Sequence, residues 1–144
     1  MPNRTIREIV AQQKILSAPA TLTVREAAIR MAEQKVGAML IMEKGLLIGI
    51  FTERDLLNRV IARRVDPDST PLSQVMTADP RTIAADKPLA HALVMMDDGG
   101  YRHVPVVDNG KIIGMVSARD ALGAELTEFE NELERREHLT EIML

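Results

Sequence analysis

The chain has 144 residues with a net charge of −3, and 46% of the residues are hydrophobic, 27% charged and 2% aromatic, a balance typical of an ordinary globular protein. The absence of cysteine excludes disulfides, a thiol nucleophile and thiolate metal sites. The acidic net charge gives no general attraction to nucleic acid, despite the small basic group Arg59, Arg63 and Arg64. No apolar run approaches the roughly 18 residues that a membrane span needs, and Met1 to Val10 has no apolar stretch like a secretory signal, so we expect a cytoplasmic protein without membrane contact.

An internal repeat organises the chain. Residues 48–55 read IGIFTERD and residues 113–120 read IGMVSARD, so that Asp120 lies 65 residues after Asp55. The same offset carries Gly45 onto Gly110 and Val10 onto Val75. Because one shift without a gap spans nearly the whole first half, the sequence indicates the duplication of one unit.

Each unit is predicted to consist of a strand, an amphipathic helix, the two strands of a hairpin and a second helix. The helices are predicted by apolar residues at positions i, i+3, i+4 and i+7, which are Val24, Ala27, Ala28 and Met31 and then Leu89, Ala92, Leu93 and Met96. Apolar runs follow at 38–42 and 46–51, and at 104–107 and 111–116. The turns between the runs contain Gly45 and Asn109-Gly110, and turns of this kind predict hairpins.

A second helix is predicted to begin at Thr52 in the first unit and at Ser117 in the second. Residues 57–71, rich in Arg, Asp and Pro, are interpreted as the end of the first of these helices and the linker. A unit of about 60 residues buries little surface alone, so the two units should pack on each other through their sheets. We therefore expect an α/β fold with a first repeat at 5–65, a second repeat at 66–126 and an amphipathic C-terminal helix at 127–144.

The most informative segments are Thr52-Glu53-Arg54-Asp55, the first motif, and Ser117-Ala118-Arg119-Asp120, the second motif. A capping box, in which a hydroxyl and an acid three residues later satisfy the first backbone N–H groups of a helix, explains both. A capping box does not require two further features of both motifs. An Arg precedes each Asp, and a glycine (Gly49, Gly114) three residues before each hydroxyl allows a close approach to the backbone. Helix N-termini attract phosphate, and a carboxylate can accept ribose hydroxyls. A nucleotide site is therefore the second interpretation.

The pattern Gly-x-x-Ser/Thr-x-x-Asp after a hairpin, with YRHVPVVD at 101–108 before the second copy, resembles the cystathionine-β-synthase (CBS) domain. Two such units in tandem resemble the paired arrangement called a Bateman module, and the resemblance covers roughly Thr5 to Leu126. It implies two pseudo-symmetric repeats with clefts between them. It also implies adenosine-type ligands in those clefts, such as AMP, ADP, ATP, S-adenosylmethionine or NAD.

Carried over by position, the resemblance implies two ligand sites. The second-repeat site would consist of Thr82, Ile83, Arg102, His103, Val104, Pro105, Ser117, Arg119 and Asp120. The first-repeat site would consist of Ser17, Ala18, Gly37, Ala38, Met39, Thr52, Arg54 and Asp55. Gly37-Ala38 stands where the second repeat has Arg102-His103, so we expect the first site to lack a cationic wall and to bind a phosphorylated ligand less tightly.

The C-terminal tail carries an apolar seam with spacings of four, three and four residues, formed by Leu122, Leu126, Phe129 and Leu133. This spacing is similar to that of a coiled coil. The tail could lie back on its own domain or contact a second copy. Since modules of the resembling family commonly pair, and most homo-oligomers are two-fold dimers, we expect a homodimer.

The expected function is regulatory and non-catalytic: the module senses an adenine nucleotide and passes a conformational change to a second copy or to an unknown effector protein. The three histidines show no metal-ligand spacing, and the sequence has no Gly-rich phosphate loop with Lys. We therefore expect no catalytic residues, no metal and no required cofactor. The alternative is a structural or dimerisation module in which both motifs are only helix caps.

Overall fold

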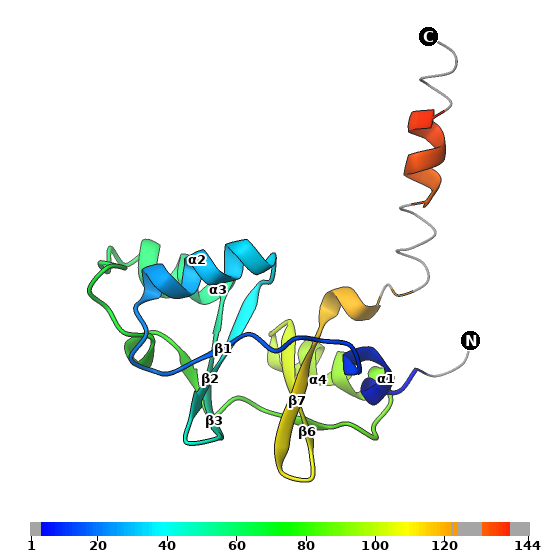
Figure 1. Ribbon diagram of the computed structural model, residues 1–144, viewed down its shortest axis with the longest axis horizontal. Coiled ribbons are helices and arrows are strands. Elements are labelled where there is room, and N and C mark those ends of the chain that lie inside the picture. Colours follow the sequence, from blue (N-terminus) through cyan, green and yellow to red (C-terminus); the bar gives the residue numbers. More distant parts are fainter. Residues whose placement is uncertain (1–3, 122, 124–130, 139–144) are drawn as a thin grey trace.

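The computed structural model describes residues 4–121, 123 and 131–138 of the chain. It contains a four-stranded sheet in the order β1-β2-β3-β4 and a three-stranded sheet in the order β5-β6-β7. Figure 1 shows the two sheets beside each other, each with its own helices. Two small sheets with helices, joined by a duplicated chain, confirm the predicted α/β fold class.

The two units have the same order of elements. The first consists of β1 (Ser17–Ala18), α2 (Val24–Gln34), β2 (Ala38–Glu43), β3 (Leu46–Thr52), α3 (Glu53–Asp55) and the π-helix η1 (Leu56–Ile61). The second consists of β5 (Ile83–Ala84), α4 (Leu89–Gly99), β6 (His103–Asp108), β7 (Lys111–Ser117) and the 3₁₀-helix η3 (Ala118–Ala121). In each unit the first short strand pairs in parallel with the first strand of the hairpin. The predicted helices and hairpins are confirmed, with bounds extended by one to three residues.

The hairpin turns confirm the prediction made from their glycines. Lys44 and Gly45 have φ of 51° and 77°, and Asn109 and Gly110 have the same pair of values. Positive φ at both central residues is the conformation that matches the twist of the flanking strands. Asn and Gly adopt it at little cost, whereas Lys44 does so with some strain.

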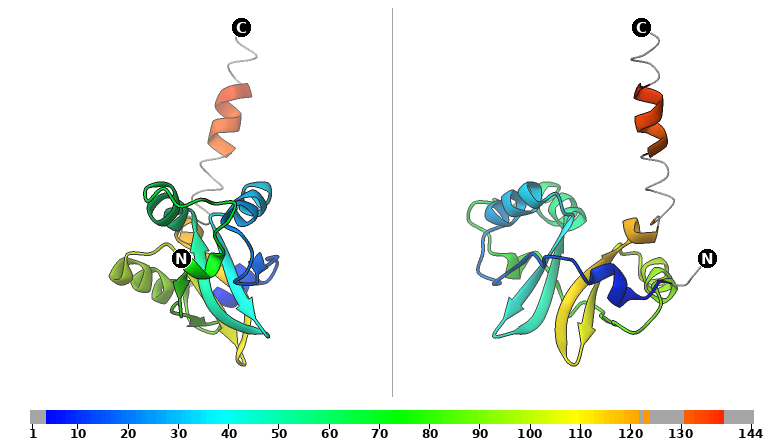
Figure 2. Two further views of the ribbon diagram at one scale, coloured as in Figure 1. Left: turned by 90° about the vertical axis from the view of Figure 1, so that its left-hand side faces the viewer. Right: turned by 45° about the vertical axis from the view of Figure 1, so that its right-hand side comes forward.

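The sheets are buried on both faces because their strands are apolar at consecutive positions. In β2, Met39 and Ile41 belong to the core that also holds Met31 of α2. The alternate residues Ala38 and Leu40 pack with Ile50, Ile112 and Met115 in a small cluster between the two sheets. This cluster confirms that the repeats join through their sheets, and Figure 2 shows the two hairpins side by side.

The leading segment of each repeat packs on the other repeat, which the sequence did not predict. Helix α1 (Ile6–Val10) contributes Ile6 and Val10 to the core of the second repeat. The 3₁₀-helix η2 (Leu72–Gln74) and β4 (Thr77–Ala78) join the first repeat, where Leu72 is fully buried and β4 pairs with β3. The two units are thus interlocked by an exchange of segments.

The exchange also explains Gly49 and Gly114. A Cβ on Gly114 would lie 2.6 Å from the Cβ of Val10, and one on Gly49 would lie 2.4 Å from the sulfur of Met76. The close approach that these glycines allow is therefore made by the exchanged segments. This corrects the sequence-based use of both glycines as evidence for a ligand.

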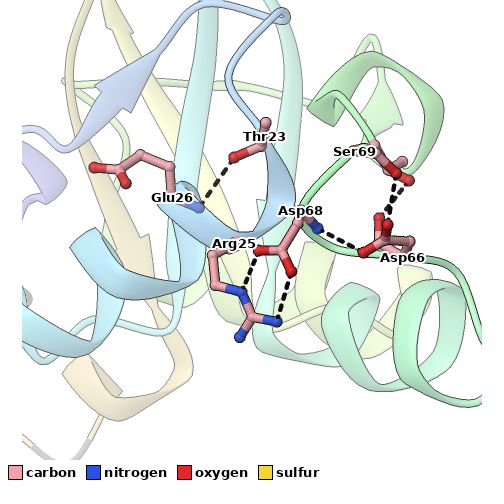
Figure 3. A network of polar contacts seen from close by, with 7 residues as sticks. Thr23, Arg25, Glu26, Asp66, Asp68 and Ser69 are labelled. Atoms are coloured by element: carbon pink, nitrogen blue, oxygen red, sulfur yellow. Dashed lines mark hydrogen bonds and ion pairs between the residues drawn. The ribbon is translucent and has the colours of Figure 1, made fainter.

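A polar network holds the linker between the repeats against the start of α2 (Figure 3). The guanidinium of Arg25 donates to both carboxylate oxygens of Asp68, at 2.7 and 3.3 Å. Thr23 caps α2 by accepting from the N–H of Glu26. The side chain of Asp66 accepts from the N–H of Asp68, which orders the turn that leads back into the first core.

Residues 131–138 form a helix whose side chains are exposed, including Leu133 at 44%. Figure 1 shows this helix standing away from both repeats. The other seam residues, Leu122, Leu126 and Phe129, lie outside the described residues. No helix in the described part of the chain is long and apolar enough to cross a membrane.

Candidate ligand clefts between the repeats

The first motif is a complete capping box. The N–H of Asp55 donates to Oγ1 of Thr52 at 3.1 Å, and the N–H of Thr52 donates to Oδ2 of Asp55 at 3.0 Å. Oδ1 of Asp55 lies 3.5 Å from the guanidinium of Arg59. Both carboxylate oxygens of Asp55 therefore already have partners.

The second motif leaves more of its acid available. The N–H of Ser117 donates to Oδ2 of Asp120 at 2.8 Å, and the Ser117 hydroxyl lies 3.4 Å from the same oxygen. Oδ1 of Asp120 has no hydrogen-bond partner within the described residues. An ionised carboxylate oxygen with free lone pairs accepts hydroxyl groups well, so the second motif can serve as a cap and bind a ligand at once.

The second motif opens onto a cleft of about 650 Å³, which we call the Ser117 cleft. Its other walls come from residues 13–16, the end of α2 with the start of β2, and Arg102-His103. Four basic side chains line it (Lys14, Lys35, Arg102 and Arg119), against the two acids Glu53 and Asp120. None of these four cations has a hydrogen bond or ion pair within the described part of the chain. A cleft of this size and charge suits an anionic small molecule.

The first motif opens onto a second cleft of about 620 Å³, the Thr52 cleft. Residues 77–81 and 99–103 of the second repeat complete it. Arg54, Arg59, Arg81 and Arg102 line this cleft, which contradicts the expectation that the first site lacks a cationic wall. The wall comes from the other repeat, which is why comparing equivalent positions missed it.

Two of those arginines are already engaged by backbone carbonyls. Arg54 donates to the carbonyl of Gly100 at 2.8 Å, and Arg59 donates to that of Met76 at 2.8 Å. Arg81 and Arg102 remain as the cations of the Thr52 cleft without a partner among the described residues. The Ser117 cleft thus has twice as many uncommitted cations.

Glu53, Arg102 and His103 line both clefts, and we call them the shared wall. Glu53 reaches this position because Gly37 has no side chain: a Cβ there would lie 3.1 Å from Oε1 of Glu53 and 3.5 Å from Nε2 of His103. The N–H of Glu53 donates to the carbonyl of Gly37 at 2.9 Å, and Ala118 makes the equivalent bond to Arg102. The duplication has therefore placed one Arg-His pair and one glutamate between two clefts.

Burial lowers the pKa of His103 below its ordinary value of 6.5. The carboxylates of Glu53 and Asp120 act in the opposite direction, and the guanidinium of Arg102 adds to the lowering. The imidazole is consequently neutral at neutral pH. An anionic group placed beside it would favour the protonated form.

The structure divides the predicted site residues into three sets. The Ser117 cleft is lined by Gly37, Ala38, Arg102, His103, Ser117, Arg119 and Asp120. The Thr52 cleft is lined by Thr52, Arg54, Asp55, Arg102 and His103. Outside both clefts lie Ser17, Ala18, Met39, Thr82, Ile83, Val104 and Pro105, of which Met39, Val104 and Pro105 are fully buried.

Each cleft is lined by residues of both repeats. Gly37 and Ala38, predicted to belong to the site of the first motif, line the cleft of the second motif. The segments just before β1 and β5 were not predicted as site residues, although residues 14–16 line one cleft and 79–81 the other. The offset of 65 relates these two segments and could have identified them as equivalent. Which motif each segment would face depends on the packing of the repeats, which has no local sequence signal.

The described residues contain no group of three or more His, Asp or Glu side chains placed to hold a metal ion.

Comparison with known proteins identifies the repeats. The family model described as "CBS domain" matches residues 6–62 and 72–127. The CBS domain-containing protein CBSCBSPB1 of Arabidopsis thaliana is 35% identical over 133 residues, which cover 92% of this chain and 24% of that protein. The chain thus spans about a quarter of the length of this relative.

Two solved structures resemble the whole module. The CBS-domain containing protein from Agrobacterium tumefaciens has a TM-score of 0.78 and 26% identity, covering 85% of this chain and 99% of that one. A CBS domain protein from Pyrobaculum aerophilum, complexed with AMP, has a TM-score of 0.76 and 28% identity, covering 88% and 97%. The chain belongs to the CBS domain family and contains two CBS domains in tandem.

Proposed function

We propose that this CBS pair binds an adenosine-type ligand in the Ser117 cleft and acts as a non-catalytic regulatory module. The observation that carries the proposal is the combination, in one cleft, of a carboxylate oxygen without a partner on Asp120 and four uncommitted cations. Asp120 would accept ribose hydroxyls, and Arg102, Arg119 and the start of η3 would hold phosphate. AMP, ADP, ATP, S-adenosylmethionine and NAD all carry the adenosine part.

The AMP complex of the Pyrobaculum aerophilum relative supports the adenosine class, because that chain shares the whole fold. Its ligand does not decide between AMP and the larger candidates. The charge of the Ser117 cleft favours ligands with phosphate over S-adenosylmethionine, whose sulfonium centre is cationic. Among the candidates we therefore rank the phosphorylated ones, AMP, ADP, ATP and NAD, ahead of S-adenosylmethionine.

The competing function is a structural or dimerisation module without a ligand. The complete capping box of the first motif favours it, since Thr52 and Asp55 satisfy each other. The second motif argues against it, because a cap alone leaves the four cations of the Ser117 cleft without a role.

A thermal-shift panel separates the two functions. AMP, ADP, ATP, S-adenosylmethionine and NAD, each with its guanine counterpart where one exists, are added to the purified chain. A ligand that binds only the folded state stabilises it by RT ln(1 + [L]/Kd), about 3 kcal/mol at a hundredfold excess over Kd. We expect stabilisation by adenine ligands alone, and a flat response to the whole panel would leave the structural module as the function.

The regulatory output proposed is a change in how this module contacts a second copy or an effector protein. We propose a homodimer in which the C-terminal seam takes part. Leu133, which is exposed, and the other exposed side chains of the helix at residues 131–138 support this proposal.

A further inference from the structure

We propose that the two clefts compete for the shared wall, so that a phosphorylated ligand in one weakens phosphorylated ligands in the other. This inference rests on the proposed function and adds a rule for how the sites are filled. It concerns ligands with phosphate and leaves adenosine itself unaffected.

The shared wall is the structural basis. Arg102 and His103 line both the Ser117 cleft and the Thr52 cleft, and their counterparts in the first repeat are Gly37 and Ala38. A duplicated protein with an Arg-His pair in each repeat could assign one pair to each cleft. Here one pair serves two clefts, and within the described residues the guanidinium of Arg102 has no ion-pair or hydrogen-bond partner that fixes it to one side.

The acid of the shared wall strengthens the competition. Glu53 lies beside His103 and also lines both clefts. Once Arg102 and His103 turn to a phosphate on one side, the second cleft keeps the Glu53 carboxylate and loses the Arg102 guanidinium and the His103 imidazole. A second phosphate then meets one uncommitted guanidinium, Arg81, if it enters the Thr52 cleft. Like charges across one wall repel, and couplings between protein sites commonly change affinity 5- to 150-fold.

The test compares the stepwise affinities of adenosine and AMP by isothermal titration calorimetry. In the wild-type chain, the second AMP enters the Thr52 cleft while the Ser117 cleft is filled. We expect its affinity to be about tenfold lower than the affinity of the Thr52 cleft for AMP when the Ser117 cleft is blocked. The affinity of that cleft alone is measured with Ala32→Trp. Ala32 is exposed on α2 and lines the Ser117 cleft only, so an indole there fills that cleft without disturbing a core.

The matched control is Glu33→Trp, which adds the same indole to the next residue of α2, outside both clefts. It should keep both AMP sites. A second variant, Arg102→Gly with His103→Ala, copies the first repeat. In this double variant the AMP that binds second should lose its disadvantage. Its affinity should equal that of AMP for the Thr52 cleft in the triple variant Arg102→Gly, His103→Ala, Ala32→Trp, in which the Ser117 cleft is blocked.

The outcomes separate the two proposals. Equal AMP affinity of the Thr52 cleft with the Ser117 cleft filled or blocked overturns the competition and leaves the proposed function intact. A gap that persists without Arg102 and His103 also overturns it, because the shared wall would not be its cause. Absence of any adenosine or AMP binding removes the proposed function itself, and the inference with it.

Discussion

Among single residues, Asp120 has the most specific proposed role, which is to accept the ribose hydroxyls of the ligand. Asp120→Asn should weaken adenosine-ligand binding by about 1.5–3 kcal/mol, the usual worth of a hydrogen bond to a charged group. Asp55→Asn is the matched control, because it alters an equivalent cap while both oxygens of Asp55 are already engaged. Calorimetry on both folded variants measures the difference. Equal losses of affinity would remove the assigned role of Asp120.

The lowered pKa of His103 predicts that both the stability of the fold and the affinity for AMP depend on pH, each with a definite sign. Because its folded-state pKa lies below 6.5, the unfolded chain binds a proton that the folded chain does not. Its contribution to stability is therefore complete above pH 6.5 and is lost as the pH falls from 6.5 through the lowered pKa. Urea unfolding of wild type and His103→Gln should show a wild-type loss over this interval that the variant lacks.

Ligand phosphate reverses the preference of the imidazole for the neutral form. The AMP phosphate also takes up a proton at about pH 6, so the effect of the imidazole is measured as a difference between wild type and His103→Gln. As the pH is lowered toward about 5.5, the AMP affinity of wild type should rise relative to that of His103→Gln, whereas the adenosine affinities of the two should keep a constant ratio. Glu53, Asp120 and Arg102 act on the same imidazole in wild type and remain in the variant. Parallel AMP pH profiles for the two chains would show that no phosphate lies beside His103.

Local residue patterns predicted the motifs and their caps, because a hydroxyl, an acid and a helix start interact within four residues. They did not predict the partners of each motif. Gly37 lines the same cleft as Asp120, and Arg81 lines the same cleft as Asp55, although the members of each pair lie far apart in the chain. Those pairings depend on packing between the repeats.

Among the elements, the exchanged segment α1 is secured in a way that the sequence did not show. The side-chain amide of Gln13 donates to the carbonyl of Met115 at 2.8 Å and accepts from its N–H at 2.9 Å. In the first sheet the backbone of β4 makes the corresponding pairing with β3. One side chain thus replaces a strand at the edge of β7.

Gly114 provides the test of this arrangement. In Gly114→Ala the new methyl group would lie 2.6 Å from the Cβ of Val10 and 2.9 Å from Oε1 of Gln13. We expect a loss of about 1–3 kcal/mol, typical of overpacking in a tight contact, measured by urea unfolding.

Adding Val10→Gly to Gly114→Ala should cost less than the two single losses combined, because removal of the Cβ of Val10 makes room for the methyl group. Strict additivity would mean that α1 does not pack against Gly114. The hairpins were predicted well because their signals are local, whereas α1 was too short and too distant from its core for its place to be predicted.

For the whole molecule, the apolar seam of the C-terminal sequence predicts how two copies associate. Truncation after Gly123 should change the light-scattering mass from two chains to one and leave nucleotide binding largely intact, since both clefts lie before that residue. The full-length chain at the same concentration is the control. A truncated chain that stays dimeric would assign self-association to the repeats, and a monomeric full-length chain at tens of micromolar would contradict the homodimer.

We have assigned the Ser117 cleft as the site of an adenosine-type ligand, and a crystal structure of the chain with AMP would test this assignment. We expect AMP between Gly37 and Asp120, with a ribose hydroxyl within hydrogen-bond distance of Oδ1 of Asp120 and phosphate beside Arg102 or Arg119. Crystals grown at saturating AMP with this cleft empty, or with the phosphate turned away from all four cations, would contradict it.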